Sequence, residues 1–183
     1  MPSRAGTVGE ITSLLEQAAQ RLEAPPLPFS LLEHSLQCAA VLSTWAPDDR
    51  ELQLAGLLHD IGHLLVGDGP DLHGVLGAEL VRPLLGERVA ALVALHVEAK
   101  RYLVSIDPSY RATLTMGSAE SLLAQGDVMS TAELARFRAE PHGADACVLR
   151  RADEAAKQPG RAVPPLAHWV PLLDELARRR RAR

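Results

Sequence analysis

The sequence contains few aromatic residues and few cysteines, and both shortages limit the possible folds. Aromatic residues make up only 3% of the 183 residues, although hydrophobic residues as a whole make up 47%. A core built from Leu, Ala and Val packs readily between helices, whereas strands favour β-branched and aromatic side chains. The two cysteines, Cys38 and Cys147, do not make a disulfide framework, so we expect a reducing, cytoplasmic environment.

The chain also lacks an excess of positive charge and a long apolar run. Its formal net charge is −4, and its basic run, Arg178 to Arg183, is typical of a solvated helix end. We therefore do not expect nucleic acid as a partner. No stretch approaches the roughly 18 consecutive apolar residues that a membrane span needs. The first residues also lack the basic and apolar regions of a signal peptide, so we expect a soluble protein.

Signals for the start of a helix occur repeatedly along the chain. Ser or Thr followed three residues later by Glu, the pattern of a capping box, occurs at Thr7, Ser30 and Ser130. Asp107 precedes Pro108, and proline suits the first turn of a helix. The apolar periodicity between the Pro and Gly breaks predicts helices over residues 7–23, 30–45, 49–64, 73–84, 86–102, 108–115, 118–125, 130–138, 144–157 and 166–180.

No segment alternates apolar and polar residues as a half-buried strand does, and no internal repeat or domain boundary is visible. We therefore predict an all-α fold. In this prediction residues 1–183 form a single helical bundle, with a core of about 30–160 and flanking helices at both ends.

The most distinctive local pattern is His59-Asp60-Ile61-Gly62-His63. On a continuous helix, His59 and His63 lie on the same face, one turn apart. The two oxygens of Asp60 can bridge two cations. The preceding residues 52–58 are strongly apolar, and polar groups that follow a buried segment need partners or a metal ion.

Further histidines lie on otherwise apolar predicted helices, at positions 34, 73 and 96. Any one of them alone would more often be a structural core residue than a ligand. Asp153 adds a carboxylate, and it shares a helix face with Arg150 and Lys157, an arrangement that is also typical of a surface salt-bridge ladder. Beside the pattern at 59–63, these residues predict a metal site, from which we leave out His142 and His168.

The chemistry of these ligands narrows the choice of metal. Imidazole and carboxylate groups without thiolates suit iron, manganese or zinc. Six ligands with one bridging carboxylate are enough for two ions and too many for one.

The order His34, His59-Asp60, Asp153 resembles the HD superfamily, whose members include metal-dependent phosphohydrolases. His63, His73 and the run from His96 to Leu103 (HVEAKRYL) resemble a narrower group, the HD-domain mixed-valent di-iron oxygenases that cleave organophosphonates, of the 2-amino-1-hydroxyethylphosphonate dioxygenase type. The resemblance covers about residues 30–160.

The resemblance implies a ligand set and a substrate site. The first iron would be held by His34, His59, Asp60 and Asp153, and the second by Asp60, His73 and His96. The phosphonate contacts would be His63, Lys100, Ser118 and Arg150. Lys100 lies one turn after His96 and Arg150 nearly one turn before Asp153, so we expect both cations beside the metals. Ser118 could instead be a simple helix cap.

The resemblance also implies the reaction. Two iron ions in the Fe(II)/Fe(III) state, with O2 as co-substrate, would cleave the C–P bond of a 1-hydroxyalkylphosphonate to a carboxylate and phosphate. His59, Asp60 and His63 would be the catalytic residues.

The chain departs from this family before the first histidine. Family members carry Tyr and Glu where this sequence has Ala24 and Leu27. The Glu contacts an amine of the substrate, so we expect a substrate with a neutral substituent, or with none. Two alternatives remain: an HD-type phosphohydrolase acting on a nucleotide or phosphate ester, and a regulatory HD domain without activity.

Overall fold

The computed structural model describes residues 6–22, 29–66 and 72–182. Over these residues the chain is helical and contains no strand, apart from an isolated antiparallel bridge between Leu22 and Ser30. The prediction of an all-α fold is confirmed. The elements are α1 (Val8–Ala18), α2 (Leu31–Trp45), α3 (Arg50–Leu58), η1 (Ile61–Leu64), α4 (His73–Leu85), α5 (Glu87–Ile106), α6 (Pro108–Arg111), α7 (Met116–Ala124), α8 (Thr131–Ala139), α9 (Gly143–Ala155) and α10 (Leu166–Arg181).

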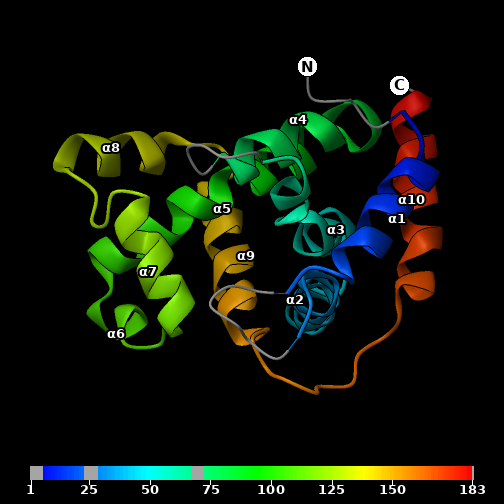
Figure 1. Cartoon of the computed structure of the whole chain (residues 1–183). Coiled ribbons are helices and arrows are strands. Elements are labelled where there is room, and N and C mark those ends of the chain that lie inside the picture. The colour runs from blue at the N-terminus through cyan, green and yellow to red at the C-terminus, as the bar shows by residue number, and fades with distance from the viewer. Residues whose placement is uncertain (1–5, 23–28, 67–71, 183) are drawn as a thin grey trace.

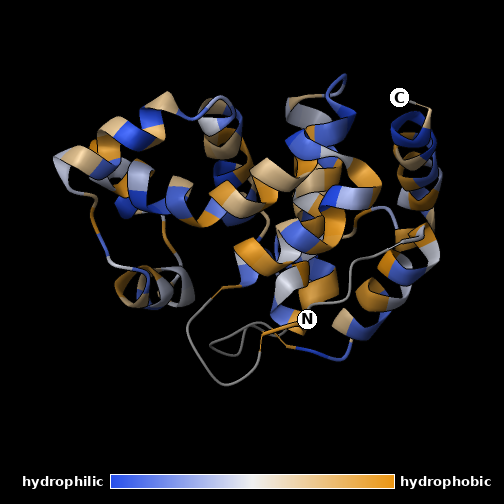
Figure 2. Ribbon diagram, turned by 90° about the horizontal axis from the view of Figure 1, so that it is seen from above, coloured by the Kyte–Doolittle hydropathy of each residue, from blue (hydrophilic) through white to orange (hydrophobic). Residues whose placement is uncertain are grey.

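The helices α2, α3, α5 and α9 form the centre of the molecule (Figure 1). Helices α1 and α10 pack together on one side of them, while α6, α7 and α8 lie on the opposite side. Most helices carry hydrophobic residues along one side (Figure 2). These sides form one large core in which Leu54, Leu58 and Leu92 are fully buried. A smaller cluster that includes Leu103, Tyr110 and Leu122 joins α5, α6 and α7.

The predicted helix starts are confirmed at the capping residues. Thr7, Ser30 and Ser130 each accept a hydrogen bond from the backbone N–H of the Glu three residues later, and that Glu bonds back to the cap. The side chain of Asp107 caps α6, with Pro108 in the first turn. These caps satisfy backbone N–H groups that would otherwise lack a partner at a helix end.

The predicted continuous helix over 49–64 is wrong in its second half. Helix α3 ends at Leu58, and the chain continues through Asp60, at φ −102° and ψ 4°, into the short 3-10 helix η1. In this turn the backbone N–H of His63 donates a hydrogen bond to the carbonyl of Asp60, and the N–H of Leu65 donates to the carbonyl of Gly62. The tighter winding rotates His63 away from the face that a continuous helix would give it.

Several helix ends also differ from the prediction. Helix α1 stops at Ala18, α5 continues to Ile106 and α6 ends at Arg111. Helix α7 begins earlier than expected because Thr115, not Ser118, is its N-cap, and the Thr115 side chain accepts a hydrogen bond from the Ser118 N–H. The interpretation of Ser118 as a helix cap is therefore wrong. In the described part of the chain, no helix is long and apolar enough to cross a membrane.

A close approach of two backbones brings η1 against α4. A Cβ atom on Gly62 would lie 1.9 Å from the carbonyl oxygen of His73 and 2.8 Å from the backbone nitrogen of Gly77. No side chain fits there without moving the backbone. Gly62 therefore allows the first turn of α4, which carries His73, to lie directly beside Asp60.

We predict that Gly62→Ala destabilises the protein by about 3 kcal/mol, because the clash is with backbone atoms. The measurement is the free energy of unfolding from chemical denaturation. Gly9→Ala in α1 is the matched control, since its Cβ would meet only Thr7 Oγ1 at 3.9 Å. That control should stabilise the helix slightly. Equal unfolding free energies for the two variants would contradict the proposed close packing.

Candidate metal centre

The first group of potential ligands comes from the consecutive helices α2 and α3 and from α9, which lies much later in the sequence. His34 comes from α2, His59 follows the last residue of α3, and Asp153 comes from α9; all three are buried. The Nε2 atoms of His34 and His59 are 3.2 Å apart. Asp153 Oδ1 lies 3.1 Å from His34 Nε2 and 3.8 Å from His59 Nε2. One cation could contact all three side chains.

The second group consists of Asp60, His73 and His96, which are also buried. His73 is the first residue of α4, and His96 lies in the middle of α5. Their Nε2 atoms are 2.9 Å apart, and each is 3.4 Å from Asp60 Oδ1.

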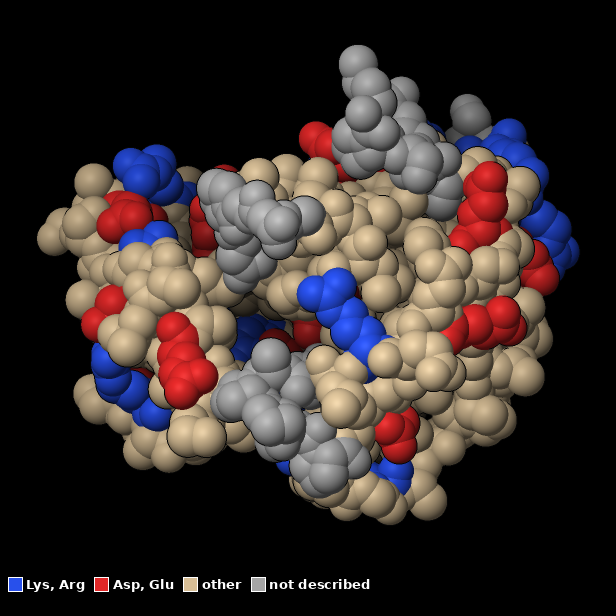
Figure 3. All heavy atoms as spheres, in the orientation of Figure 1, with Lys and Arg blue, Asp and Glu red and all other residues tan. Residues whose placement is uncertain are grey.

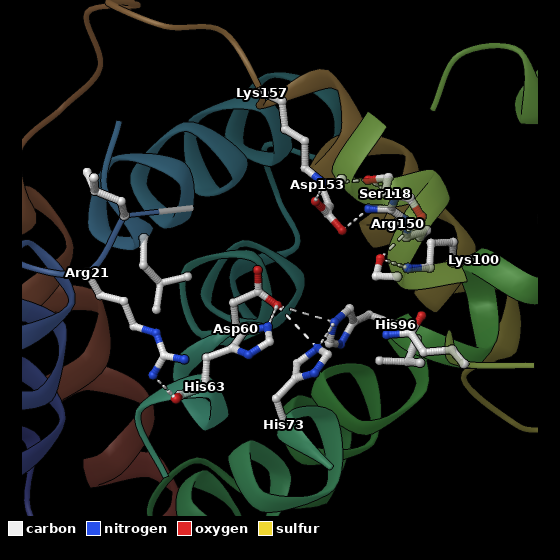
Figure 4. A pocket seen from close by; sticks show the side chains of 16 residues that line it. Arg21, Asp60, His63, His73, His96, Lys100, Ser118, Arg150, Asp153 and Lys157 are labelled. Carbon is white, nitrogen blue, oxygen red and sulfur yellow. Dashed lines mark hydrogen bonds and ion pairs between the residues drawn. The ribbon is translucent and has the colours of Figure 1, made fainter. Parts of the chain in front are cut away.

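Asp60 lies between the two groups, and its two oxygens face different histidines (Figure 4). Oδ2 is 3.2 Å from His59 Nε2 and 3.7 Å from His34 Nε2, while Oδ1 faces His73 and His96. This arrangement suits a carboxylate that bridges two cations. Burial raises the pKa of Asp60, but the neighbouring His59, His96 and His63 outweigh it and hold this pKa well below its usual value.

The imidazole nitrogens and carboxylate oxygens of the two groups are better suited to bind metal ions than to form hydrogen bonds with one another. His59 Nδ1 lies 2.8 Å from the Gly56 carbonyl and His96 Nδ1 lies 2.7 Å from the Val93 carbonyl. A carbonyl only accepts, so each Nδ1 carries a hydrogen, and in a neutral imidazole the lone pair is then on Nε2, the atom that faces the other ligands. Burial lowers the pKa of His96 to about 3, which keeps this imidazole neutral. Lone pairs and carboxylate oxygens thus converge, as metal ligands do.

The spacing of these atoms also suits metal ions. Two ligands that each lie ~2.1 Å from an ion at right angles are about 3 Å apart. The Nε2 pairs at 3.2 Å and 2.9 Å match that separation.

A cavity of about 200 Å³ adjoins Asp60, and cationic side chains line its other end. It opens on the face shown in Figure 3, where basic and acidic atoms lie deep in the hollow. Lys100 is buried there and donates a hydrogen bond to Ser121 Oγ at 2.7 Å. Burial, followed by repulsion from Arg150 and Lys157, lowers the pKa of Lys100 to about 7.

Arg150 is fully buried beside this cavity and is held by carboxylates. It donates hydrogen bonds to Asp153 and Glu154 and lies 3.2 Å from Ser118 Oγ. Ser118 Oγ donates to Glu154 at 2.8 Å. Burial raises the pKa of Glu154, but Arg150 and Lys157 outweigh it and leave this pKa at about 2. Glu154 therefore stays ionised and offsets one of the buried cations.

His63 lies beside the metal-ligand groups without belonging to either of them. Its side chain is 33% exposed, its Nε2 is 3.8 Å from Asp60 Oδ1, and its ring stacks on that of His73 at 3.9 Å between centroids. It lines the same cavity as Lys100 and Arg150. His142 and His168, which the sequence analysis left out, belong to neither group.

Four residues that the sequence analysis did not select take part in this site. Lys157 donates to Ser118 Oγ at 2.7 Å, and its spacing of four from Asp153 was the available signal. Ser121 and Glu154 contact the selected cations, and Arg21 lines the cavity from the end of α1. The spacing of four between Arg150 and Glu154 was a signal of the same kind, whereas no periodicity relates Ser121 to Lys100 or Arg21 to the cavity. Ala24 and Leu27 lie outside the described residues.

Comparison with known proteins places the chain in a family. Residues 31–177 match the family described as HD domain. A hydroxymethylphosphonate dioxygenase from Gimesia maris is 37% identical over 147 residues, which cover 75% of this chain and 73% of that protein. A 1-hydroxy-2-(trimethylamino)ethylphosphonate dioxygenase (glycine-betaine-forming) from Leisingera caerulea is 31% identical over 157 residues, which cover 81% of this chain and 80% of that protein.

We predict that substitutions of the two groups have different effects on metal content. Asp60→Ala should lose most of both ions, because its two oxygens face both groups. His34→Ala and His96→Ala should each lose mainly one. The measurement is metal per chain by elemental analysis after identical loading, with the exposed His168→Ala as control. If Asp60→Ala retained both ions, the bridging geometry would be wrong.

Proposed function

This chain belongs to the HD-domain phosphonate oxygenase family, and we propose that it uses O2 to cleave the C–P bond of a 1-hydroxyalkylphosphonate. The observation that carries the proposal is the juxtaposition of two histidine–carboxylate groups with a cavity lined by Lys100, Ser118 and Arg150. A simple binding domain has no need of such a ligand set. The names of the two relatives support a phosphonate as the substrate class.

We propose iron as the metal at both groups. His34, His59, Asp60 and Asp153 would hold one ion, and Asp60, His73 and His96 the other. When bound as an Fe(II)/Fe(III) pair, the two ions supply the activation of O2 and the transfer of electrons. Neutral imidazoles and carboxylates suit iron.

The side chains at the other end of the cavity would bind the phosphonate. Lys100 and Arg150 would donate hydrogen bonds to its oxygens, and the Ser118 hydroxyl, which lies 3.2 Å from Arg150, would add a further contact. Lys157 lies against Ser118 and would add a further positive charge. Asp153 and Glu154 hold the guanidinium of Arg150 in place, so this end of the site is ordered before substrate arrives.

The remaining groups would orient the reacting carbon and exclude water. His63 is the partly exposed imidazole beside Asp60, and it would donate a hydrogen bond to the substrate at the metal-facing side of the cavity. The reaction balances as R–CH(OH)–PO3H2 + O2 giving R–COOH and H3PO4. The C–H and C–P bonds break, carbon and phosphorus each gain an oxygen, and O2 is reduced.

The test of this function is phosphate release from hydroxymethylphosphonate by the iron-loaded protein. We expect O2 uptake and phosphate release in equal amounts, with formate as the carbon product, and no phosphate under argon. Release of phosphate from phosphate esters without O2 uptake, together with inactivity toward hydroxymethylphosphonate, would instead assign the site to the phosphohydrolases.

We predict that Lys100→Met raises the KM for hydroxymethylphosphonate by about tenfold to a hundredfold, while metal content stays unchanged. The loss of a charge-assisted hydrogen bond costs ~1.5–3 kcal/mol. Lys100 is the better choice than Arg150, whose removal would leave Lys157 as the remaining cation beside Asp153 and Glu154 and would disturb their ion pairs.

Lys100→Arg is the charge-retaining control and should recover part of the loss. The measurement is KM and kcat by phosphate release, with iron per chain measured on the same samples. An unchanged KM in Lys100→Met would remove Lys100 from the substrate site.

A further inference from the structure

A fourth basic residue, Arg21, lines the cavity at the end away from the proposed phosphonate site. It shares the cavity with Asp60, His63 and Lys100. Figure 4 shows Arg21 on one side of Asp60, with Lys100 and Arg150 on the other. A substrate that bound its phosphonate at Lys100 and Arg150, and its reacting carbon near Asp60, would therefore extend its substituent toward Arg21.

The backbone at Arg21 is held in place by its neighbours. Its N–H donates to the Ala18 carbonyl at 3.2 Å, and its carbonyl accepts from the Leu31 N–H at 2.7 Å. The bridge between Leu22 and Ser30 continues this contact with the start of α2. The backbone of Arg21 is thus attached to the start of α2, the helix that carries His34, while its side chain is exposed.

The side chain of Arg21 is only partly engaged. One guanidinium nitrogen donates a hydrogen bond to the backbone carbonyl of His63. Among the residues that the structure describes, no carboxylate pairs with this guanidinium, in contrast to Arg150, which contacts Asp153 and Glu154. Its neighbours in the cavity wall include the apolar Leu22 and Leu31. Among the described residues, Arg21 is therefore a cation without an acidic partner at this end of the cavity.

We propose that Arg21 is a specificity-determining residue that binds a carboxylate on the substituent of the substrate. This inference rests on the proposed function and names the substrate class more closely: a 1-hydroxyalkylphosphonate with a second anionic group, in place of the neutral substituent expected from the sequence. A guanidinium presents two parallel N–H groups that match the two oxygens of a carboxylate. An ammonium at the same place would meet a positive charge and no acidic partner from the described residues.

The reaction of such a substrate has the same stoichiometry as that of the simple 1-hydroxyalkylphosphonate. For 3-hydroxy-3-phosphonopropanoate, the products with one O2 are malonate and phosphate. The second carboxylate takes no part in bond breaking, and Arg21 acts only in binding and positioning it.

The test compares kcat/KM for three probes: hydroxymethylphosphonate, 3-hydroxy-3-phosphonopropanoate and 2-amino-1-hydroxyethylphosphonate. We expect the protein to prefer the carboxylated over the aminated probe by about a hundredfold. Arg21→Gln should reduce this ratio by about tenfold to a hundredfold, since a charge-assisted pair is lost. Arg21→Glu should reverse the preference, and Arg21→Lys, which keeps the charge but not the two parallel N–H groups, should restore only part of it.

The matched control is Arg179→Glu, the same charge change on the exposed end of α10, where Arg179 pairs with Glu175. It should leave the ratio unchanged. Iron per chain, measured for each variant, separates a loss of the site from a change in specificity.

The outcomes distinguish the two proposals. Suppose that the protein turns over hydroxymethylphosphonate, and that the ratio of kcat/KM for the carboxylated probe to that for the aminated probe is the same in the unsubstituted protein and in Arg21→Glu. That result would overturn the role of Arg21 but not the proposed function. A preference for the aminated probe in the unsubstituted protein would also overturn it. Failure to release phosphate from all three probes with O2 uptake would overturn the proposed function, and the role of Arg21 with it.

Discussion

The carboxylate of Asp60 is the group on which the arrangement of the site depends. One of its oxygens faces His59 and His34 and the other faces His73 and His96, so four histidines from different parts of the chain converge on one side chain. Such an arrangement brings together buried imidazole nitrogens and carboxylate oxygens, which are costly to bury without partners, and a cation between them would be such a partner. The break between α3 and η1 and the close contact at Gly62 are the backbone features that give Asp60 this position.

Much of this could be predicted from the sequence, because the signals were local or chemical. Capping boxes and proline positions identified the helix starts, and the histidines and aspartates on apolar segments identified the ligand groups. The 3-10 turn at 61–64 could not be predicted, because it depends on a tertiary contact between Gly62 and the backbone of His73. Arg21 was missed for the same reason, because its contact with the His63 carbonyl joins segments whose proximity no periodicity records. Glu154 was missed although it lies four residues after Arg150 on one helix, a spacing that is visible in the sequence.

The distribution of charge around the cavity explains how so many cations can be buried together. Arg150 and Lys157 both contact the carboxylates of Asp153 and Glu154, which offset them. Among the described residues no carboxylate pairs with Lys100, which donates a hydrogen bond to the Ser121 hydroxyl, and burial followed by repulsion from Arg150 and Lys157 lowers its pKa to about 7. A bound phosphonate would supply the missing negative charge and favour the protonated amine. In our proposal the substrate's anion therefore completes the electrostatics of the pocket.

The central claim is that Asp60 joins two iron ions into a single redox unit. Electron paramagnetic resonance of protein loaded with iron under argon and then partially oxidised tests it directly. The account predicts the signal of a spin-coupled Fe(II)/Fe(III) pair, which changes when hydroxymethylphosphonate is added and is absent in Asp60→Ala. A spectrum of isolated ferric ions that hydroxymethylphosphonate leaves unchanged would contradict it.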